Sequence, residues 1–201
     1  MPLDVGVAPL DLADLPDDLR RQLAPRVQRL GYLGDFFRYC GHQPDALLHF
    51  YLFTEALKDA LPPDLTEAVA LTVAAATGND YERAQHERLA RRLGFADPRI
   101  AALAGSEAQP AGLSGEQLGA RAVALAMLDR DWDRAQSNLA GLAARVGERQ
   151  AIGVLMMAAR YLAHSAISNT LHLAVPGAAT PPGTTDAAPA RHDPAADRAD
   201  A

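Results

Sequence analysis

The sequence is poor in cysteine and in aromatic residues. Cys40 is its single cysteine, so no disulfide can form within the chain, and a lone thiol fits a reducing compartment. Aromatic residues make up only 5% of the 201 residues although 49% are hydrophobic, so alanine and leucine supply most of the apolar surface. Both are strong helix formers. We therefore expect one cytoplasmic, helical domain with a sizeable core.

Clustered positive charge is also scarce. The chain has 19 Lys and Arg against 25 Asp and Glu, and adjacent arginines occur only at Arg20-Arg21 and Arg91-Arg92, which we interpret as solvated helix faces. Phosphate binding needs concentrated positive charge, so we expect no nucleic-acid partner. No apolar run approaches the roughly 18 residues of a membrane span. Residues 1–11 lack Lys and Arg, so we expect neither a membrane segment nor a signal peptide.

The helix signals predict an all-α fold of eight or nine helices with no sheet. Prolines and capping residues precede most apolar stretches, and glycines follow them. Pro25 predicts a kink or a division into two pieces in the first helix. Residues 14–175 form the expected domain, after an extended segment 1–13 and before a disordered, Ala/Pro-rich tail 176–201. The expected helices are 14–30, 34–40, 43–60, 65–77, 80–93, 97–104, 116–129, 131–146 and 148–173.

The most informative segment begins the helix expected at 80–93. Glu82 and His86 share a face with Leu89, Ala90 and Leu93, at the spacing of one stripe of an α-helix. Leucine and alanine at such positions face a core. Burying a charge there is costly unless the charge is paired or used. The pair therefore indicates a functional site, whereas on an exposed face it would be an ordinary contact between successive turns.

Glu67 is the third candidate, in the helix that precedes this one. Residues 68–76 are apolar except for Thr72, so this helix is expected to be buried all round, and desolvation should raise the pKa of Glu67. Two helices joined by a short turn pack as an antiparallel pair. That arrangement permits a contact between Glu67 and His86 without requiring it.

The segments 61–67 and 77–86, followed by Ala90 and Gly94, resemble the carboxymuconolactone decarboxylase / alkylhydroperoxidase D-like (AhpD-like) family. The family pattern is a glutamate, then a Cys-x-x-Cys about twelve residues later, then a histidine four residues past the second cysteine. Glu67 and His86 match the glutamate and the histidine, and Asn79 and Glu82 stand where the cysteines would be. Residues 31–37 and 42–44 resemble the larger members. The likeness covers residues 14–175 and implies an AhpD-like helical fold.

The missing Cys-x-x-Cys separates this chain from the thiol peroxidases of the family. The decarboxylase members also lack both cysteines and carry a glutamate four residues before the histidine, as Glu82 stands here. The resemblance therefore implies a cofactor-independent, acid–base lyase or isomerase acting on a small carboxylated or carbonyl-bearing molecule. It also implies a homo-oligomer: a trimer, a hexamer or a dimer.

The expected roles follow from the chemistry of each residue type. His86 would transfer a proton next to a carbonyl, Glu67 would be its partner or a second acid/base, and Glu82 would set its tautomer. Tyr81 and Asn79 would donate hydrogen bonds to the developing oxyanion. Relatives with a histidine at the place of His42 suggest that it also lines the substrate pocket.

Other readings remain open at this point. Asn79 and His42 fit helix capping, and Cys40 fits a small core residue. Arg149 and Arg160 could hold a substrate carboxylate, although surface ion pairs fit them better. A zinc site would need a third ligand beside Glu82 and His86, from His42, His49 or His164, but no spacing indicates one and we expect no metal. A thiol-independent relative of the antioxidant enzymes, or a non-catalytic binding protein on the same scaffold, would be the alternative functions.

Overall fold

The computed structural model describes residues 6–107 and 110–175, and these residues fold into helices without any strand. The predicted all-α architecture is confirmed. The disordered tail expected from residue 176 onward lies outside the described residues, as does the start of the segment expected at 1–13. A short 3-10 helix precedes the α-helices, which are α1 (Asp17–Leu30), α2 (Asp35–Cys40), α3 (Pro44–Ala60), α4 (Pro63–Ala76), α5 (Asp80–Arg92), α6 (Asp97–Ala104), α7 (Gly115–Leu128), α8 (Trp132–Val146) and α9 (Glu148–Thr170).

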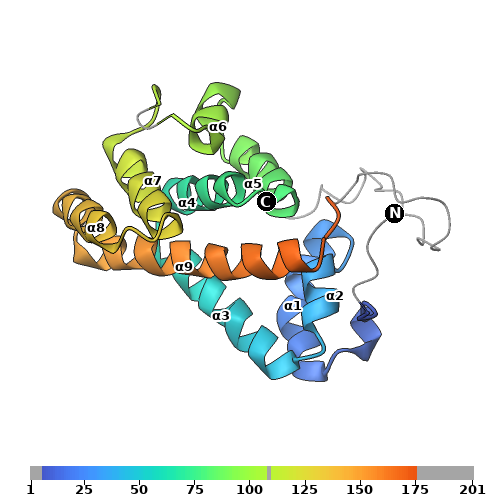
Figure 1. The fold of residues 1–201 in the computed structure, drawn as a ribbon. Coiled ribbons are helices and arrows are strands. Elements are labelled where there is room, and N and C mark those ends of the chain that lie inside the picture. Colours follow the sequence, from blue (N-terminus) through green and yellow to red (C-terminus); the bar gives the residue numbers. More distant parts are fainter. Residues whose placement is uncertain (1–5, 108–109, 176–201) are drawn as a thin grey trace, which may run out of the picture.

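Helix α4 lies at the centre of the fold and is packed against α5, α6, α7 and α9 (Figure 1). Every residue from Leu65 to Ala74 is buried, as the uniformly apolar sequence predicts. Thr72 is accommodated because its hydroxyl donates to the carbonyl of Leu103, 3.3 Å away. The large core cluster joins α3, α4, α7 and α9.

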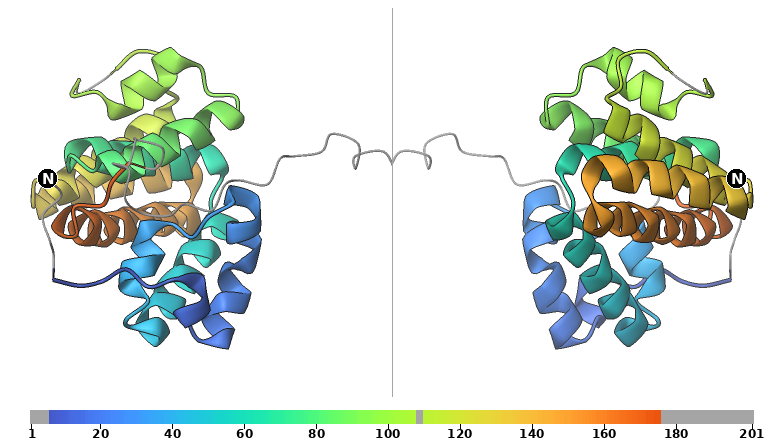
Figure 2. Two further views of the ribbon diagram at one scale, coloured as in Figure 1. Left: turned by 90° about the vertical axis from the view of Figure 1, so that its right-hand side faces the viewer. Right: turned by 90° about the vertical axis from the view of Figure 1, so that its left-hand side faces the viewer.

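Helices α1, α2 and α3 lie together at one side of the molecule (Figure 2). They share a second core cluster, in which Tyr81 from α5 also packs. The long helix α9 runs past both parts of the fold, and its middle and end carry buried polar residues as well as apolar ones. The two clusters therefore meet where α5 and α9 pass between them.

The α4–α5 hairpin is set by local sequence. Pro63 occupies the first turn of α4, where its missing N–H costs nothing. Gly78 takes a left-handed conformation with φ of 63° between the two helices, which suits glycine. Asn79 then caps α5 by accepting a hydrogen bond from the backbone N–H of Glu82 at 3.1 Å. This turn fixes the start of the helix that carries the motif.

Three expectations about the elements need correction. Helix α1 begins at Asp17 rather than residue 14, because Leu12–Asp14 forms a separate 3-10 helix within the segment expected to be extended. The expected division at Pro25 was wrong: α1 is one helix, and its proline lies on the exposed side.

The third correction concerns α9, which is long and apolar enough to cross a membrane by length and composition alone. Its 18-residue window has a mean hydropathy of 1.3, and half of that window is buried inside the fold. Helix α9 packs against α3, α4, α7 and α8. A core helix that is packed in this way can satisfy the length and composition test for a membrane span without crossing a membrane.

Candidate functional site

The candidate site is a cavity of about 150 Å³ between the two core clusters. Helix α5 contributes Tyr81, Glu82 and His86 to its wall, and α9 contributes Arg160, Tyr161 and His164. Helices α1, α2 and α3 close the opposite side with aromatic and basic side chains. The cavity is therefore assembled from segments far apart in the sequence.

His86 lies between two buried carboxylates. Its Nδ1 is 2.9 Å from Oε2 of Glu67, and its Nε2 is 3.5 Å from Oε2 of Glu82. Burial alone would lower the pKa of His86, but the two carboxylates outweigh it and raise that pKa to about 9. His86 is therefore an imidazolium at neutral pH. Glu67 does not line the cavity, so it supports His86 from behind.

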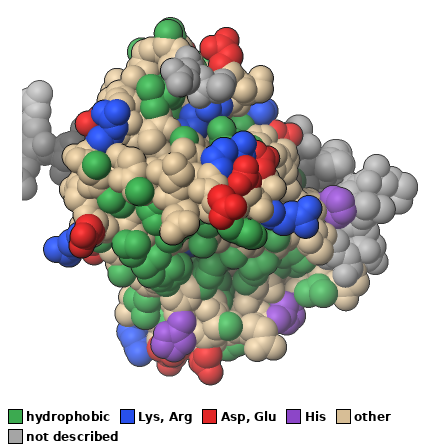
Figure 3. Space-filling view, turned by 60° about the vertical axis from the view of Figure 1, so that its left-hand side comes forward, with side chains coloured by type: hydrophobic (Ala, Val, Ile, Leu, Met, Phe, Trp, Pro, Cys, Tyr) green, Lys and Arg blue, Asp and Glu red, His purple; other side chains and the backbone are tan. Residues whose placement is uncertain are grey.

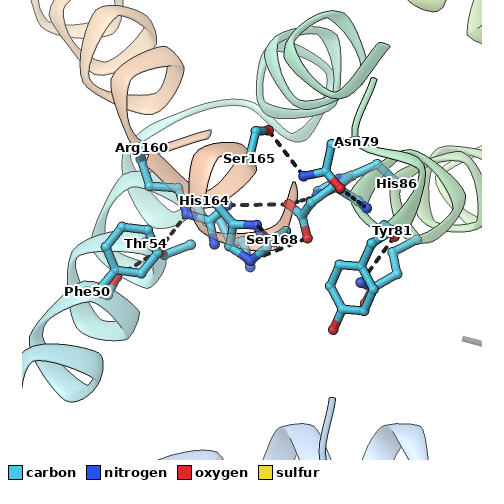
Figure 4. A network of polar contacts seen from close by, with 12 residues as sticks. Phe50, Thr54, Asn79, Tyr81, His86, Arg160, His164, Ser165 and Ser168 are labelled. Carbon is cyan, nitrogen blue, oxygen red and sulfur yellow. Dashed lines mark hydrogen bonds and ion pairs between the residues drawn. The ribbon is translucent and has the colours of Figure 1, made fainter. Parts of the chain in front are cut away.

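Glu82 contacts three basic side chains, His86, Arg160 and His164, which are labelled in Figure 4. Besides His86, its carboxylate lies 3.5 Å from Nη1 of Arg160 and 3.6 Å from Nε2 of His164. Burial would raise the pKa of Glu82, but its basic neighbours hold it well below the usual range. At these distances the contacts are ion pairs rather than short hydrogen bonds. Glu82 is therefore charged at neutral pH.

His164 is held rigidly and is uncharged. Its ring stacks on Phe36 with centroids 3.9 Å apart and a 17° angle between planes. Burial first, and then the nearby Arg160 and His86, lower the pKa of His164 to about 3 despite the opposing charge of Glu82. Its Nδ1 is 3.0 Å from the hydroxyl of Ser168. A neutral His164 cannot attract Glu82 as a full charge, so His86 and Arg160 keep that carboxylate ionised at neutral pH.

Arg160 is a buried part of the site and not the surface ion pair expected from the sequence. Its side chain is 10% exposed, and Nε donates to the hydroxyl of Thr54 at 2.9 Å. The guanidinium also lies over the rings of Phe50 and Tyr161, 5.1 and 4.5 Å from their centroids. These contacts fix it beside Glu82.

Two tyrosines, Tyr81 and Tyr161, line the cavity. Tyr81, predicted to bind substrate, is buried and lines the cavity, and burial raises its pKa. Tyr161 packs edge-on against His86 with centroids 5.1 Å apart. Its hydroxyl is buried, has no hydrogen-bond partner among the described residues, and is kept protonated because burial raises its pKa. Both tyrosines can therefore donate a hydrogen bond.

Two residues predicted to bind substrate lie elsewhere. Asn79 does not line this cavity: its side chain caps α5 and its amide donates to the hydroxyl of Ser165 at 3.2 Å. His42 is exposed between α2 and α3, with Nε2 2.8 Å from the carbonyl oxygen of Ala8. The structure thus gives Asn79 the capping role that was its alternative and uses His42 to hold the N-terminal segment.

The sequence reading missed the contribution of α9. Arg160, His164 and Ser168 follow one another at four-residue spacing in an otherwise apolar helix. The argument that singled out Glu82 and His86 applies equally to this stripe and would have found it. Arg92, interpreted as part of a solvated face, also lines the cavity. Among the described residues no group of three or more His, Cys, Asp or Glu side chains is arranged to hold a metal ion.

Cys40 lies apart from the cavity. It is partly buried against the cluster of α1, α2 and α3, close to the core role expected of it. Burial raises the pKa of its thiol to about 11. A thiol in that state is a poor nucleophile at neutral pH.

The fold and the site together define an all-α protein with a buried Glu–His–Glu cluster beside a small cavity. Residues 44–126 match the model of the carboxymuconolactone decarboxylase family. The crystal structure of an AhpD-core protein from Ralstonia eutropha JMP134, described as an uncharacterized peroxidase-related protein, has a TM-score of 0.74 at 18% identity and covers 85% of this chain and 91% of that one. No curated protein compared with the sequence matches it. Residues 44–126 are therefore similar to the carboxymuconolactone decarboxylase family, and the chain has the AhpD-like fold.

Proposed function

We propose that this protein is a cofactor-independent acid–base enzyme, a lyase or isomerase that acts on a small carboxylated or carbonyl-bearing molecule in the cytoplasm. The observation that carries the proposal is the position of His86. It is an imidazolium at the wall of the cavity, with Glu67 behind it and Glu82 beside it. A proton donor held in this way is suited to general acid catalysis.

In this proposal the two nitrogens of His86 have different tasks. Nδ1–H donates to Glu67, which fixes the ring, while Nε2–H lies on the side of Glu82 and the cavity. In a decarboxylation the carbon–carboxylate bond breaks, carbon dioxide leaves, and the electron pair stays on the substrate as an enolate. The hydroxyl of Tyr161 or Tyr81 donates to the enolate oxygen. His86 then gives its Nε2 proton to the carbon and recovers one from water.

An isomerisation uses the same groups in sequence. Neutral His86 removes a proton from a carbon beside a carbonyl and returns it, as an imidazolium, to a second carbon. Because the pKa of His86 is about 9, the acid form dominates at neutral pH and the base form gains as the pH rises. The predominance of the acid form favours the lyase reaction over the isomerisation, because the lyase reaction needs a protonated His86 in the resting enzyme.

The test is a panel of small carboxylated lactones and β-keto acids incubated in deuterium oxide, with loss of carbon dioxide and carbon-bound deuterium followed by NMR. We expect His86→Gln to lower the rate by about 10²–10⁴-fold, the range of general acid–base catalysis. Cys40→Ala is the matched control and should retain full activity, because Cys40 lies outside the cavity. Full turnover by His86→Gln would overturn the proposal.

We also propose that the protein assembles as a homo-oligomer, with a small molecule rather than a nucleic acid or a membrane as its ligand. Hydrophobic side chains gather in a band on the face shown in Figure 3. Helix α9 leaves Ile152, Met156 and Ile167 between 37% and 48% exposed. Contiguous exposed apolar surface favours an interface with another protein surface.

A further inference from the structure

The cavity has a charge opposite to that of the whole chain. Six basic residues line it, although the chain has a net charge of −6. Only two acidic residues, Glu55 and Glu82, line it as well. A cleft lined by one sign of charge raises the local concentration of the opposite ion. The basic lining residues are Arg26, Arg29, Lys58, Arg88, Arg92 and Arg160.

The innermost charges cancel one another. Glu67 and Glu82 carry two negative charges, and His86 and Arg160 carry two positive ones at neutral pH. Arg160 is further engaged by Thr54 and by two aromatic rings. It is therefore committed to the cluster. Lys58 on α3 is paired with Glu55 at 2.9 Å, so the net positive charge of the cavity comes from helices α1 and α5.

Arg26 on α1 differs from the other basic residues of the wall. Its guanidinium lies over the ring of Phe37, 5.1 Å from the centroid, which steadies the side chain. Its Nε is buried and has no hydrogen-bond partner among the described residues. The charge of Arg26 also acts to lower the pKa of Tyr81, Tyr161 and His164. Arg26 thus directs a fixed positive charge across the cavity toward the acid–base cluster.

We propose that Arg26 binds the anionic group of the substrate, a carboxylate or a phosphate, and that the basic mouth around it favours multiply charged anions over singly charged ones. A guanidinium matches either group with paired N–H donors. That the bound anion belongs to a substrate rests on the proposed acid–base function. That Arg26 binds an anion does not depend on that function. Arg26 lies outside residues 44–126, so the anchor belongs to the part of this chain that the family model does not match.

The test is calorimetric titration of the full-length protein at low salt with acetate, succinate and inorganic phosphate. We expect succinate or phosphate to bind at least tenfold more tightly than acetate, with affinity that falls as salt increases. The better of the two probes identifies the substrate group. Arg26→Gln should weaken that binding at least tenfold, and Arg26→Lys should restore only part of it, because lysine keeps the charge without the paired donors.

Arg21→Gln is the matched control, since Arg21 is an exposed residue of α1 outside the cavity, and it should change affinity less than twofold. Equal affinity in Arg26→Gln and Arg21→Gln would overturn the proposal, as would a wild-type protein that binds none of the three anions. Circular dichroism of each variant shows whether the fold is retained, and Arg26→Lys tests the anchor if Arg26→Gln unfolds.

His86→Gln separates this inference from the proposed function. It should abolish turnover and leave anion binding within a fewfold of wild type. If His86→Gln keeps turnover while Arg26→Gln loses anion binding, the acid–base function fails and the anchor stands. If Arg26→Gln lowers kcat while KM and anion affinity stay unchanged, the anchor fails and the acid–base function stands.

Discussion

His86 and Glu67 are 19 positions apart in the sequence and 2.9 Å apart in the fold, joined across the α4–α5 hairpin. Glu67 is 2% exposed and reaches His86 from the side away from the cavity. The imidazole is thereby oriented by one carboxylate, while the other faces the ligand space.

Replacement of Glu67 should show how far its carboxylate raises the pKa of His86. We expect Glu67→Gln to bring the pKa of His86 from about 9 back toward its ordinary value of 6.5, because the uncharged amide no longer favours the imidazolium. The measurement is an NMR titration of the histidine ring protons. Glu87→Gln, a change on the outer part of α5, should leave that titration unaltered; a similar shift there would contradict the assignment.

The raised pKa of His86 also predicts how stability depends on pH. The folded protein binds this proton more tightly than the unfolded chain, so the associated stability is complete below pH 6.5 and is lost as the pH rises through about 9. The contribution is on the order of 3 kcal/mol. Urea unfolding of wild type between pH 6 and 10 should show this loss, and Glu67→Gln should flatten it. Equal slopes in both proteins would rule out the coupling.

Glu82 should be the most sensitive position of the cluster for folding. Glu82→Gln removes the carboxylate shared by His86 and Arg160 and leaves buried positive charge without its partner. We expect a loss of about 3–5 kcal/mol in the free energy of unfolding. Glu87→Gln serves again as the control, since the pairs of Glu87 with Arg83 and Arg91 are surface contacts worth about 1 kcal/mol at most. A loss from Glu82→Gln as small as that of the control would contradict the central role of Glu82.

Ser168 should fix the tautomer of His164. We expect the proton of the neutral ring on Nε2, toward the carboxylate of Glu82, so that Nδ1 accepts a hydrogen bond from the hydroxyl of Ser168. In ¹⁵N-labelled wild type we expect a single Nε2–H tautomer that remains neutral down to about pH 4, and in Ser168→Ala a mixture of tautomers. Ser165→Ala is the matched control, since the nearby Ser165 contacts Asn79 instead. A His164 that is protonated at pH 7 would disprove this reading.

The thiol of Cys40 should be unreactive in the folded protein. With a pKa of about 11, only about one molecule in ten thousand carries a thiolate at pH 7. Iodoacetamide should therefore label Cys40 slowly in buffer and quickly in denaturant, and hydrogen peroxide consumption should be the same in wild type and Cys40→Ala. Rapid labelling of the native protein would revive a thiol-based activity.

Sequence reasoning predicted the part of the site that lies within one hairpin. Glu82 and His86 share a helical stripe, and the short turn at Gly78 brings Glu67 within reach, so local rules sufficed for all three residues. The stripe that carries Arg160 could have been recognised in the same way, but its meeting with Arg26 at one cavity could not, because that depends on how α1 and α9 pack against α5. The same packing, unknown from sequence, moved His42 to the outside.

The fold itself was predictable because capping residues, glycines and apolar periodicity agree along the chain. Gly78, Gly94 and Gly147 all take positive φ at or near helix ends, as their positions suggested. The start of α1 was less predictable, since Asp14 and Asp17 both precede helix-forming residues. The carboxylate of Asp14 accepts a hydrogen bond from the backbone N–H of Asp11 at 2.9 Å in the 3-10 helix, and α1 begins at Asp17.

The proposed anion anchor and the proposed proton donor come from different parts of the chain. Arg26 and part of the aromatic wall, Phe36 and Phe37, come from the first forty residues, whereas His86 and its carboxylate neighbours come from α4 and α5. A change in α1 or α2 can therefore alter which anion is accepted while the proton donor stays intact. For protein engineering, α1 is therefore the helix to mutate in order to change substrate specificity, because such changes leave the α4–α5 hairpin with the proposed proton donor intact.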